Sequence, residues 1–178
     1  MIWLYYFILF ILGTAVIFVV VMMITLIRTR VPFVSLSKKK VDKVLDLVRL
    51  DSSKKLYDLG CGDARFLVRA YKKYNISGVG YELNWWALLR SKWNVFIYKA
   101  DVAIYNKNFL KIDLDDADYI FIYLVSEALI KLEKKLLTNP RSARQVISYG
   151  FKFPNLKPTE VLYTEDRKDR GRVYIYNI

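Results

Sequence analysis

The chain has 178 residues, enough for one domain with its own core and a short additional segment. It contains no histidine, which excludes histidine-dependent catalytic triads and histidine metal sites. A single cysteine allows no disulfide within one chain, which favours a reducing compartment. The net charge of +12 would suit anionic lipid headgroups or nucleic acid. The basic residues are scattered rather than interleaved with aromatic residues in one patch, and this favours lipid, with no nucleic-acid partner expected.

The run from Met1 to Ile27 is apolar and aromatic and carries no charged side chain. About 20 helical residues cross a bilayer core, so this run is long enough to span one with some tilt. It lacks the basic start and the small-residue cleavage site of a signal peptide, which favours a retained transmembrane anchor over a cleaved signal or a core helix. All 29 Lys and Arg residues follow it. Their position predicts an outward N-terminus and a catalytic domain on the cytoplasmic, or matrix-equivalent, side of a single-pass membrane protein.

Residues 28–40 form a basic connector, and residues 41–178 are expected to form one domain. Apolar spacing predicts helices over 41–50, 64–74, 84–92 and 126–137, the third of them capped by Asn84. Strands are expected over 56–59, 77–83, 94–100, 117–125 and 144–151, followed by a hairpin of 160–165 and 171–178. Strands that alternate with helices predict an α/β fold with a doubly wound, Rossmann-like parallel sheet, here completed by the C-terminal antiparallel hairpin.

The stretch LYDLGCGDAR, residues 56–65, joins the first strand to its helix through a glycine-rich turn, where doubly wound sheets bind ligands. Gly60 and Gly62 would let a ligand approach the backbone closely. The stretch lacks the third glycine of a dinucleotide fingerprint and the Gly-Lys-Ser/Thr of a phosphate loop. Its carboxylates, Asp58 and Asp63, are unsuited to phosphate and suit a cationic ligand such as the amino group or sulfonium region of S-adenosylmethionine.

Two further acidic residues are placed at predicted strand ends. Glu82 ends the second strand, about 20 residues downstream, where a carboxylate can accept hydrogen bonds from both ribose hydroxyls. Asp101 follows the expected third strand and could reach an adenine amino group. The glycine turn alone is a weak signal, but three strand-end acids in register with it predict a cofactor site.

Several segments resemble a known family. LYDLGCGDAR, GVGYEL and KADV resemble the successive cofactor motifs of class I (seven-stranded) methyltransferases. VPFV, GYELN, DADYIFIYLVSEALIKLEKKL, RQVISYGFKFP and RVYIYNI resemble one group within that class. This group is the small, membrane-anchored protein-lysine methyltransferases related to the mitochondrial enzymes that modify adenine nucleotide translocase and the ATP synthase c subunit. The resemblance covers nearly all of residues 31–178.

The resemblance implies S-adenosylmethionine as cofactor and a lysine side chain of a membrane-associated protein as acceptor. The cofactor-binding residues that it implies are Asp58, Gly60, Gly62, Asp63, Glu82, Asp101, Val102 and Leu124. Tyr123 is implied beside the transferable methyl, as the candidate catalytic residue; an aromatic that merely packs is the alternative for it. Pro32, Phe33 and Val34 are implied to fold over the cofactor and shape the substrate opening. Ala64 departs from the family, which more often has glycine there.

Other features favour structural roles. Cys61 has no histidine partner and is expected to be a small loop residue rather than a nucleophile. The acidic run Asp113, Asp115 and Asp116 is typical of a solvated loop, and no metal is expected. For the tryptophans at 85, 86 and 93, core or membrane-facing packing is favoured over a place in a cofactor or substrate pocket.

Two other functions remain open from the sequence. One keeps the cofactor but uses a lipophilic small molecule, such as a quinone or lipid, as acceptor. The other is a cofactor-binding but inactive membrane module.

Overall fold

The computed structural model describes residues 2–29, 35–138, 144–165 and 171–178. Contacts divide the chain into two compact units, Met1–Pro32 and Phe33–Ile178. The described part of the first unit is helix α1 (Ile2–Thr29). Its window Ile2–Met23 is long and apolar enough to cross a membrane by length and composition, and none of it is buried. The predicted apolar helix is therefore present, and its place in a membrane stays a prediction.

The second unit alternates helices and strands around one sheet. Its helices are α2 (Lys38–Val48), α3 (Arg65–Tyr74), α4 (Trp85–Tyr98), the short 3₁₀-helix η1 (Phe109–Lys111) and α5 (Ser126–Thr138). Its strands are β1 (Lys55–Leu59), β2 (Ser77–Tyr81), β3 (Val102–Tyr105), β4 (Tyr119–Ile122), β5 (Gln145–Tyr149), β6 (Glu160–Tyr163) and β7 (Arg172–Asn177).

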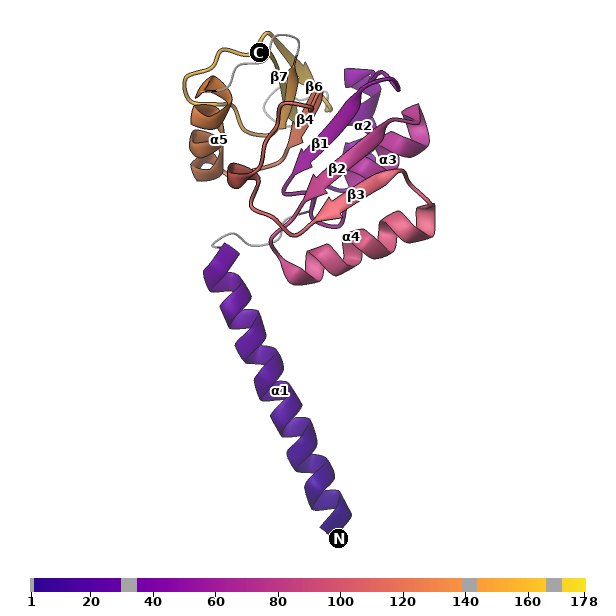
Figure 1. Ribbon diagram of the computed structural model, residues 1–178, viewed down its shortest axis with the longest axis vertical. Helices are drawn as coiled ribbons and strands as arrows, with labels where there is room; N and C mark the ends of the chain where they lie inside the picture. The colour runs from indigo at the N-terminus through magenta and orange to yellow at the C-terminus, as the bar shows by residue number, and fades with distance from the viewer. Residues whose placement is uncertain (1, 30–34, 139–143, 166–170) are drawn as a thin grey trace. The chain divides into compact units, whose positions relative to one another are not determined.

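The seven strands form a single sheet in the order β3-β2-β1-β4-β5-β7-β6 (Figure 1). Strands β1 to β5 pair in parallel, whereas β7 is antiparallel to both β5 and β6. This arrangement confirms the predicted doubly wound sheet and its C-terminal antiparallel hairpin.

Alternate residues of the strands face two apolar cores, as the period of two along a strand requires. On one side, Leu56 of β1 and Phe121 of β4 pack with residues of α2 and α3. On the other side, Leu59 and Ile120 pack with α5. Helix α4 lies on the α2–α3 side, where its Val95 contacts the first core. Residues 150–159, between β5 and β6, contain no helix.

Helix α2 begins earlier than the sequence pattern predicts. The Ser37 hydroxyl accepts a hydrogen bond from the backbone N–H of Lys40, at 3.3 Å, and so caps the helix. Lys38 and its two neighbours, assigned above to the basic connector, therefore belong to the helix. Leu36, also within the predicted connector, is buried in the first core.

The expected third strand over 94–100 is wrong. Residues 94–98 continue helix α4, whose start is capped as predicted: the Asn84 side chain accepts from the backbone N–H groups of Trp86 and Ala87, at 3.0 and 3.1 Å. The strand lies later, at Val102–Tyr105. A short apolar run cannot be assigned to helix or strand by periodicity alone, and here the run continues a helical face.

Candidate active site

The carboxyl ends of the first strands meet along one edge of the sheet. Leu59 at the end of β1 pairs with Tyr81 of β2 and with Ile122 of β4. Tyr81 in turn pairs with Tyr105, the last residue of β3. The residues that follow these strands therefore lie at the edge where doubly wound folds bind ligands.

The glycine turn after β1 is held against β2 by its backbone. The N–H groups of Gly60 and Cys61 both donate to the Tyr81 carbonyl, at 2.9 and 3.1 Å. Gly60 has φ +85°, and a Cβ there would lie 3.1 Å from Leu124 Cδ2. The turn thus needs glycine both for its conformation and for space. The same contact places Leu124 beside the turn, and its predicted cofactor contact stays a prediction.

The turn ends on a strained residue. Ala64, the N-cap of α3, adopts a left-handed conformation with φ +59° and makes no side-chain capping hydrogen bond. A left-handed conformation costs a non-glycine residue about 1–2 kcal/mol. This explains physically why glycine suits the position, and why alanine is the departure noted above.

Glu82 joins the turn to helix α4. Its Oε2 accepts a hydrogen bond from the Gly62 N–H at 2.9 Å, and its Oε1 accepts one from the Asn84 N–H at 2.7 Å. Asn106, which follows β3, donates through Nδ2 to the Glu82 carbonyl at 2.7 Å. The carboxylate is therefore fixed at the edge of the sheet, and each of its oxygens has lone-pair capacity for a further donor such as a ribose hydroxyl.

Asp58 is a buried carboxylate beside the turn, with 3% of its surface exposed. Burial, together with the nearby charges of Glu82 and Asp63, raises the pKa of Asp58 well above its ordinary value. A cation placed next to Asp58 would stabilise its ionised form. This environment suits the positively charged end of S-adenosylmethionine.

Asp63 has a partner within the chain. Its two carboxylate oxygens accept hydrogen bonds from Nε and Nη2 of Arg65, at 2.8 and 2.6 Å. Burial opposes the charge of Asp63, but these hydrogen bonds and the charge of Arg65 outweigh it and lower the pKa of Asp63. Arg65 also donates through Nη1 to the Leu36 carbonyl at 2.6 Å. Asp63 thus positions the turn against the segment before α2, and its cofactor contact stays a prediction.

Asp101 and Val102 do not lie at this edge, which disagrees with the adenine contact predicted for Asp101 and with the cofactor contact implied for Val102. Val102 begins β3 and pairs with Gly78, near the amino end of β2. The Asp101 carbonyl accepts from the Gly78 N–H at 3.0 Å, at the same end of the sheet. The error follows from placing the third strand too early. Asn106, which follows β3 at the correct edge, was missed for the same reason.

Tyr123 directly follows β4 and is half-buried. Its ring meets the ring of Tyr149 edge-on, with centroids 5.5 Å apart. A Cβ on Gly150 would lie 3.7 Å from Tyr123 Cε2. The ring therefore does pack, and it also borders the open region next to Gly150. Tyr149, which sequence reasoning missed, is buried, and among the described residues its hydroxyl has no hydrogen-bond partner.

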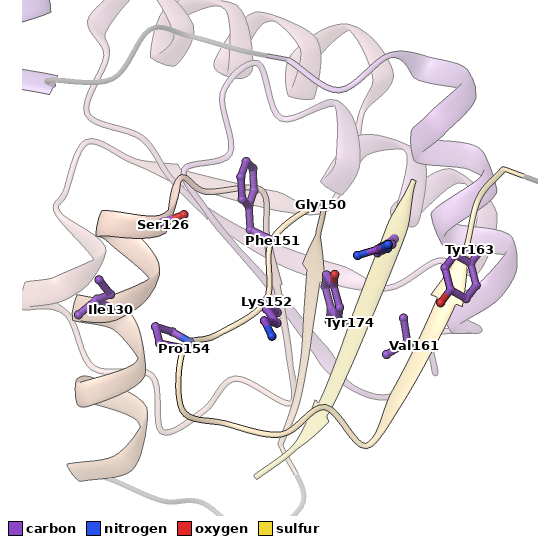
Figure 2. A pocket seen from close by; sticks show the side chains of 10 residues that line it. Ser126, Ile130, Gly150, Phe151, Lys152, Pro154, Val161, Tyr163 and Tyr174 are labelled. Carbon is purple, nitrogen blue, oxygen red and sulfur yellow. The ribbon is translucent and has the colours of Figure 1, made fainter. Parts of the chain in front are cut away.

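An open groove of about 560 Å³ begins at Gly150 and extends over β7 and β6. Figure 2 shows Ser126 and Ile130 of α5 on one side of it and Tyr163 of β6 on the other. Lys152 and Arg172 also line the groove. Its start next to Gly150 brings it close to Tyr123, so it could hold an acceptor segment. The predicted substrate-opening residues, Pro32, Phe33 and Val34, lie outside the described residues.

The structure supports a packing role for Cys61. The residue is buried, and burial together with the charges of Asp58 and Glu82 raises the pKa of its thiol well above the ordinary value, so the thiol stays protonated.

The acidic run before β4 forms local hydrogen bonds. Asp113 Oδ1 accepts from the Asp115 N–H at 2.8 Å, and Asp116 Oδ1 accepts from the Tyr57 hydroxyl at 2.5 Å. Within the described part of the chain, no group of three Cys, Asp or Glu side chains is arranged to hold a metal ion.

Comparison with known proteins identifies relatives of this chain. The sequence profile described as the ANTKMT methyltransferase domain matches residues 58–160. A protein-lysine N-methyltransferase of Saccharolobus islandicus is 30% identical over 153 residues, which cover 83% of this chain and 94% of the relative. The adenine nucleotide translocase lysine N-methyltransferase of Mus musculus is 29% identical over 154 residues, which cover 85% of this chain. The match spans only 65% of that mouse protein.

A solved structure agrees with this assignment. It is described as an RNA methyltransferase from Salinibacter ruber in complex with S-adenosyl-L-homocysteine. It superposes with a TM-score of 0.74 and 25% sequence identity, over 82% of this chain and 94% of that one. The bound molecule is the demethylated form of the cofactor that the site residues suggest. The chain therefore belongs to the ANTKMT methyltransferase domain family, whose members are S-adenosylmethionine-dependent class I methyltransferases.

Proposed function

We propose that this protein transfers methyl groups from S-adenosylmethionine to a lysine side chain of a membrane-associated protein, and that α1 anchors it in the membrane. The observation that carries the proposal is the Glu82 carboxylate, held at the sheet edge between the N–H groups of Gly62 and Asn84. The family relationship supports the reaction, and the names of the relatives support lysine as the acceptor.

The residues at the edge of the sheet fit the cofactor. The cofactor supplies a methyl group on a positively charged sulfur when it is bound. Gly60 and Gly62 leave the backbone accessible, Glu82 would accept from the ribose hydroxyls, and Asp58 would face the positive methionine end. The buried Asp58 supports this orientation, because a cation compensates for a carboxylate removed from water.

The main task of the chain at the acceptor is positioning, because methyl transfer is an in-line displacement. The amine attacks through its lone pair, so a lysine must first lose its proton, here to water. Lys152 and Arg172 line the groove that begins at Gly150, the neighbour of Tyr123. The like charge of Lys152 would lower the pKa of a lysine entering that groove and so favour the neutral amine. Tyr123 would shape the opening without exchanging a proton.

The membrane part of the proposal rests on two observations. Helix α1 is long and apolar enough to span a bilayer, and all Lys and Arg residues follow Ile27. The distribution of charge favours an outward N-terminus, with the catalytic unit on the inner side. An anchor would raise the effective concentration of acceptors in the same membrane. Protease protection of sealed vesicles tests the orientation: the catalytic unit of inward-oriented protein should be protected until detergent is added.

The test of the reaction is to incubate membranes containing the full chain with methyl-labelled S-adenosylmethionine. We expect label on a lysine of a membrane protein, identified by mass spectrometry, and no label with Glu82→Ala. Asp101→Asn is the matched control, because Asp101 lies at the opposite edge of the sheet, and it should label normally. Label in the lipid extract would instead support a lipophilic acceptor. Label in RNA would overturn the protein acceptor, and cofactor binding without any label would indicate an inactive module.

A further inference from the structure

Helix α4 exposes a continuous apolar surface that the proposed reaction does not use. Trp93 is 64% exposed and Phe96 is 73% exposed, although both are large and aromatic. The exposed residues of this surface, called here the α4 apolar face, are Trp85, Trp86, Leu89, Trp93, Phe96 and Ile97. Scattered exposed apolar residues are normal on a protein, but a contiguous set of this size indicates an interaction surface.

The α4 apolar face lies on one side of the helix. Its residues are separated by one, three or four positions, and the helical repeat of 3.6 residues places residues with these separations on the same side. The opposite side packs on the protein through Ala87, Leu88 and Ser91, all of which are buried. The core therefore uses one side of α4, and the exposed apolar residues lie on the opposite side.

The basic residues beside the α4 apolar face indicate which kind of partner it binds. Helix α4 contains no acidic residue, and Arg90, Lys92 and the C-cap residue Lys99 are all exposed. A helix that combines tryptophan and aliphatic residues on one face with basic residues at its borders is typical of helices that lie in the membrane interface. Tryptophan is enriched at that level, and basic residues attract anionic headgroups.

Two other partners fit less well. A second copy pairing through this face would bring the same cations together, with no acidic residue on α4 to balance them. Single-stranded nucleic acid binds basic grooves in which bases stack on aromatic rings. Here the aromatic residues lie on the exposed surface of a helix rather than in a groove. They are interspersed with Leu89 and Ile97, whose side chains have no flat ring for a base to stack on.

We propose that the α4 apolar face inserts into the interface of a bilayer that contains anionic lipids, as a second membrane contact in addition to α1. The proposal rests on the membrane location proposed above but not on the identity of the methyl acceptor. The N-cap residue of α4, Asn84, donates its backbone N–H to the Glu82 carboxylate at the proposed cofactor site. Docking α4 on the bilayer would therefore hold the sheet edge near the headgroups, within reach of acceptor lysines at the membrane surface.

The first test uses tryptophan fluorescence of the full chain in vesicles of phosphatidylcholine and phosphatidylglycerol. Trp3→Phe leaves the three α4 tryptophans as the only ones in the chain. With phosphatidylcholine brominated near the headgroup end of its acyl chains, we expect about a twofold loss of their emission and a blue shift. The quenching should weaken when phosphatidylglycerol is omitted.

The control moves the fluorophore away from α4. A variant that combines Trp3→Phe, Trp85→Phe, Trp86→Phe and Trp93→Phe with Tyr163→Trp carries its only tryptophan on β6, where Tyr163 is 38% exposed. Its emission should be unaffected by bromine. Flotation with the vesicles without quenching of the α4 tryptophans would overturn the docking proposal. Failure of the chain to float would instead overturn the proposed membrane location.

A second test asks whether docking serves the reaction. Trp93→Glu combined with Phe96→Glu places charges on the exposed stripe without touching the buried side of α4. We expect a severalfold loss of methylation of an acceptor in membranes and unchanged methylation of the same acceptor in detergent. Equal loss in both conditions would contradict docking, as would dimer-specific cross-linking through α4 or protection of α4 by single-stranded RNA.

Discussion

Folded proteins usually bury apolar side chains and expose charged ones. The turn after β1 and helix α4 both depart from this rule, each in its own way. In the turn, acidic side chains are buried: Asp58 and Asp63 are 3% and 5% exposed. On α4, by contrast, tryptophan and phenylalanine face outward. Both arrangements are unfavourable for an isolated chain, because buried charge and exposed apolar surface each cost free energy.

The difference between the two regions shows what kind of partner each one needs. Hydrogen bonds join the turn to β2, α4 and the segment before α2, and the turn is suited to one small cationic molecule. The α4 apolar face is extended and has no acidic residue, and it is suited to a broad apolar surface with anionic headgroups. Substitutions in the turn should therefore affect ligand binding, whereas substitutions on the stripe should affect location and leave the fold unchanged.

The largest expected effect is that of Glu82→Ala. This change removes the carboxylate that we propose to accept from the ribose hydroxyls, together with its hydrogen bonds to the Gly62 and Asn84 N–H groups. We expect S-adenosylmethionine to bind about 100-fold more weakly, equivalent to about 2.7 kcal/mol, by isothermal titration calorimetry. Binding within a factor of two of the unmodified protein would show that the cofactor does not use this edge.

Asp58→Asn should separate binding from stability. We expect cofactor affinity about tenfold lower, because the positive end loses its carboxylate. At neutral pH we expect the ligand-free variant to be more stable to urea by about 1–2 kcal/mol, because the free-energy cost of burying an ionisable carboxyl group has been removed. A loss of stability would show that the Asp58 carboxylate is needed by the fold rather than by the ligand.

The same residue predicts a dependence on pH. The pKa of Asp58 is raised on folding, so the folded chain holds a proton that the unfolded chain releases. Its contribution to stability is therefore full below the ordinary aspartate pKa and is lost as the pH rises through the raised value. Cofactor affinity should change in the opposite direction, rising with pH over that window as the carboxylate ionises. Asp58→Asn should remove this component of both pH profiles.

The sequence predicted the turn well because its signals are local. Glycines, strand-end acids and the Asn84 cap act within a few residues of their own backbone. The parallel sheet was also predicted correctly, from the alternation of strands and helices along the chain. The C-terminal hairpin was predicted from two strand patterns on either side of a polar turn. The third strand was wrong because an apolar run usually indicates burial, and in α4 the apolar residues are the exposed ones. Tyr149 was not identified as a neighbour of Tyr123, because that contact joins the ends of two strands and depends on tertiary pairing.

The observed position of β3 leads to a prediction about two residues, with a smaller expected effect on cofactor binding. Asn106 holds the Glu82 backbone at the correct edge, so Asn106→Ala should weaken cofactor binding about threefold by a modest shift of Glu82. Asp101→Asn, at the opposite edge, should leave the affinity unchanged. Isothermal titration calorimetry of the two variants measures which of these residues contributes to cofactor affinity. The reverse ranking would restore Asp101 to the adenine site and contradict the observed register of β3.

The smallest expected effect is on the stability of the α4 apolar face. Phe96→Ser alters a residue that is 73% exposed, so we expect the free energy of unfolding to change by no more than about 0.5 kcal/mol. Phe66→Ala is the buried counterpart: Phe66 is 2% exposed and its ring stacks on Phe121, so we expect a loss of about 3–5 kcal/mol. Both are measured by urea unfolding of the full chain in detergent. A large loss of unfolding free energy with Phe96→Ser would mean that the α4 apolar face packs against another part of this chain. The contrast between a ligand-binding turn and a lipid-facing helix would then be wrong.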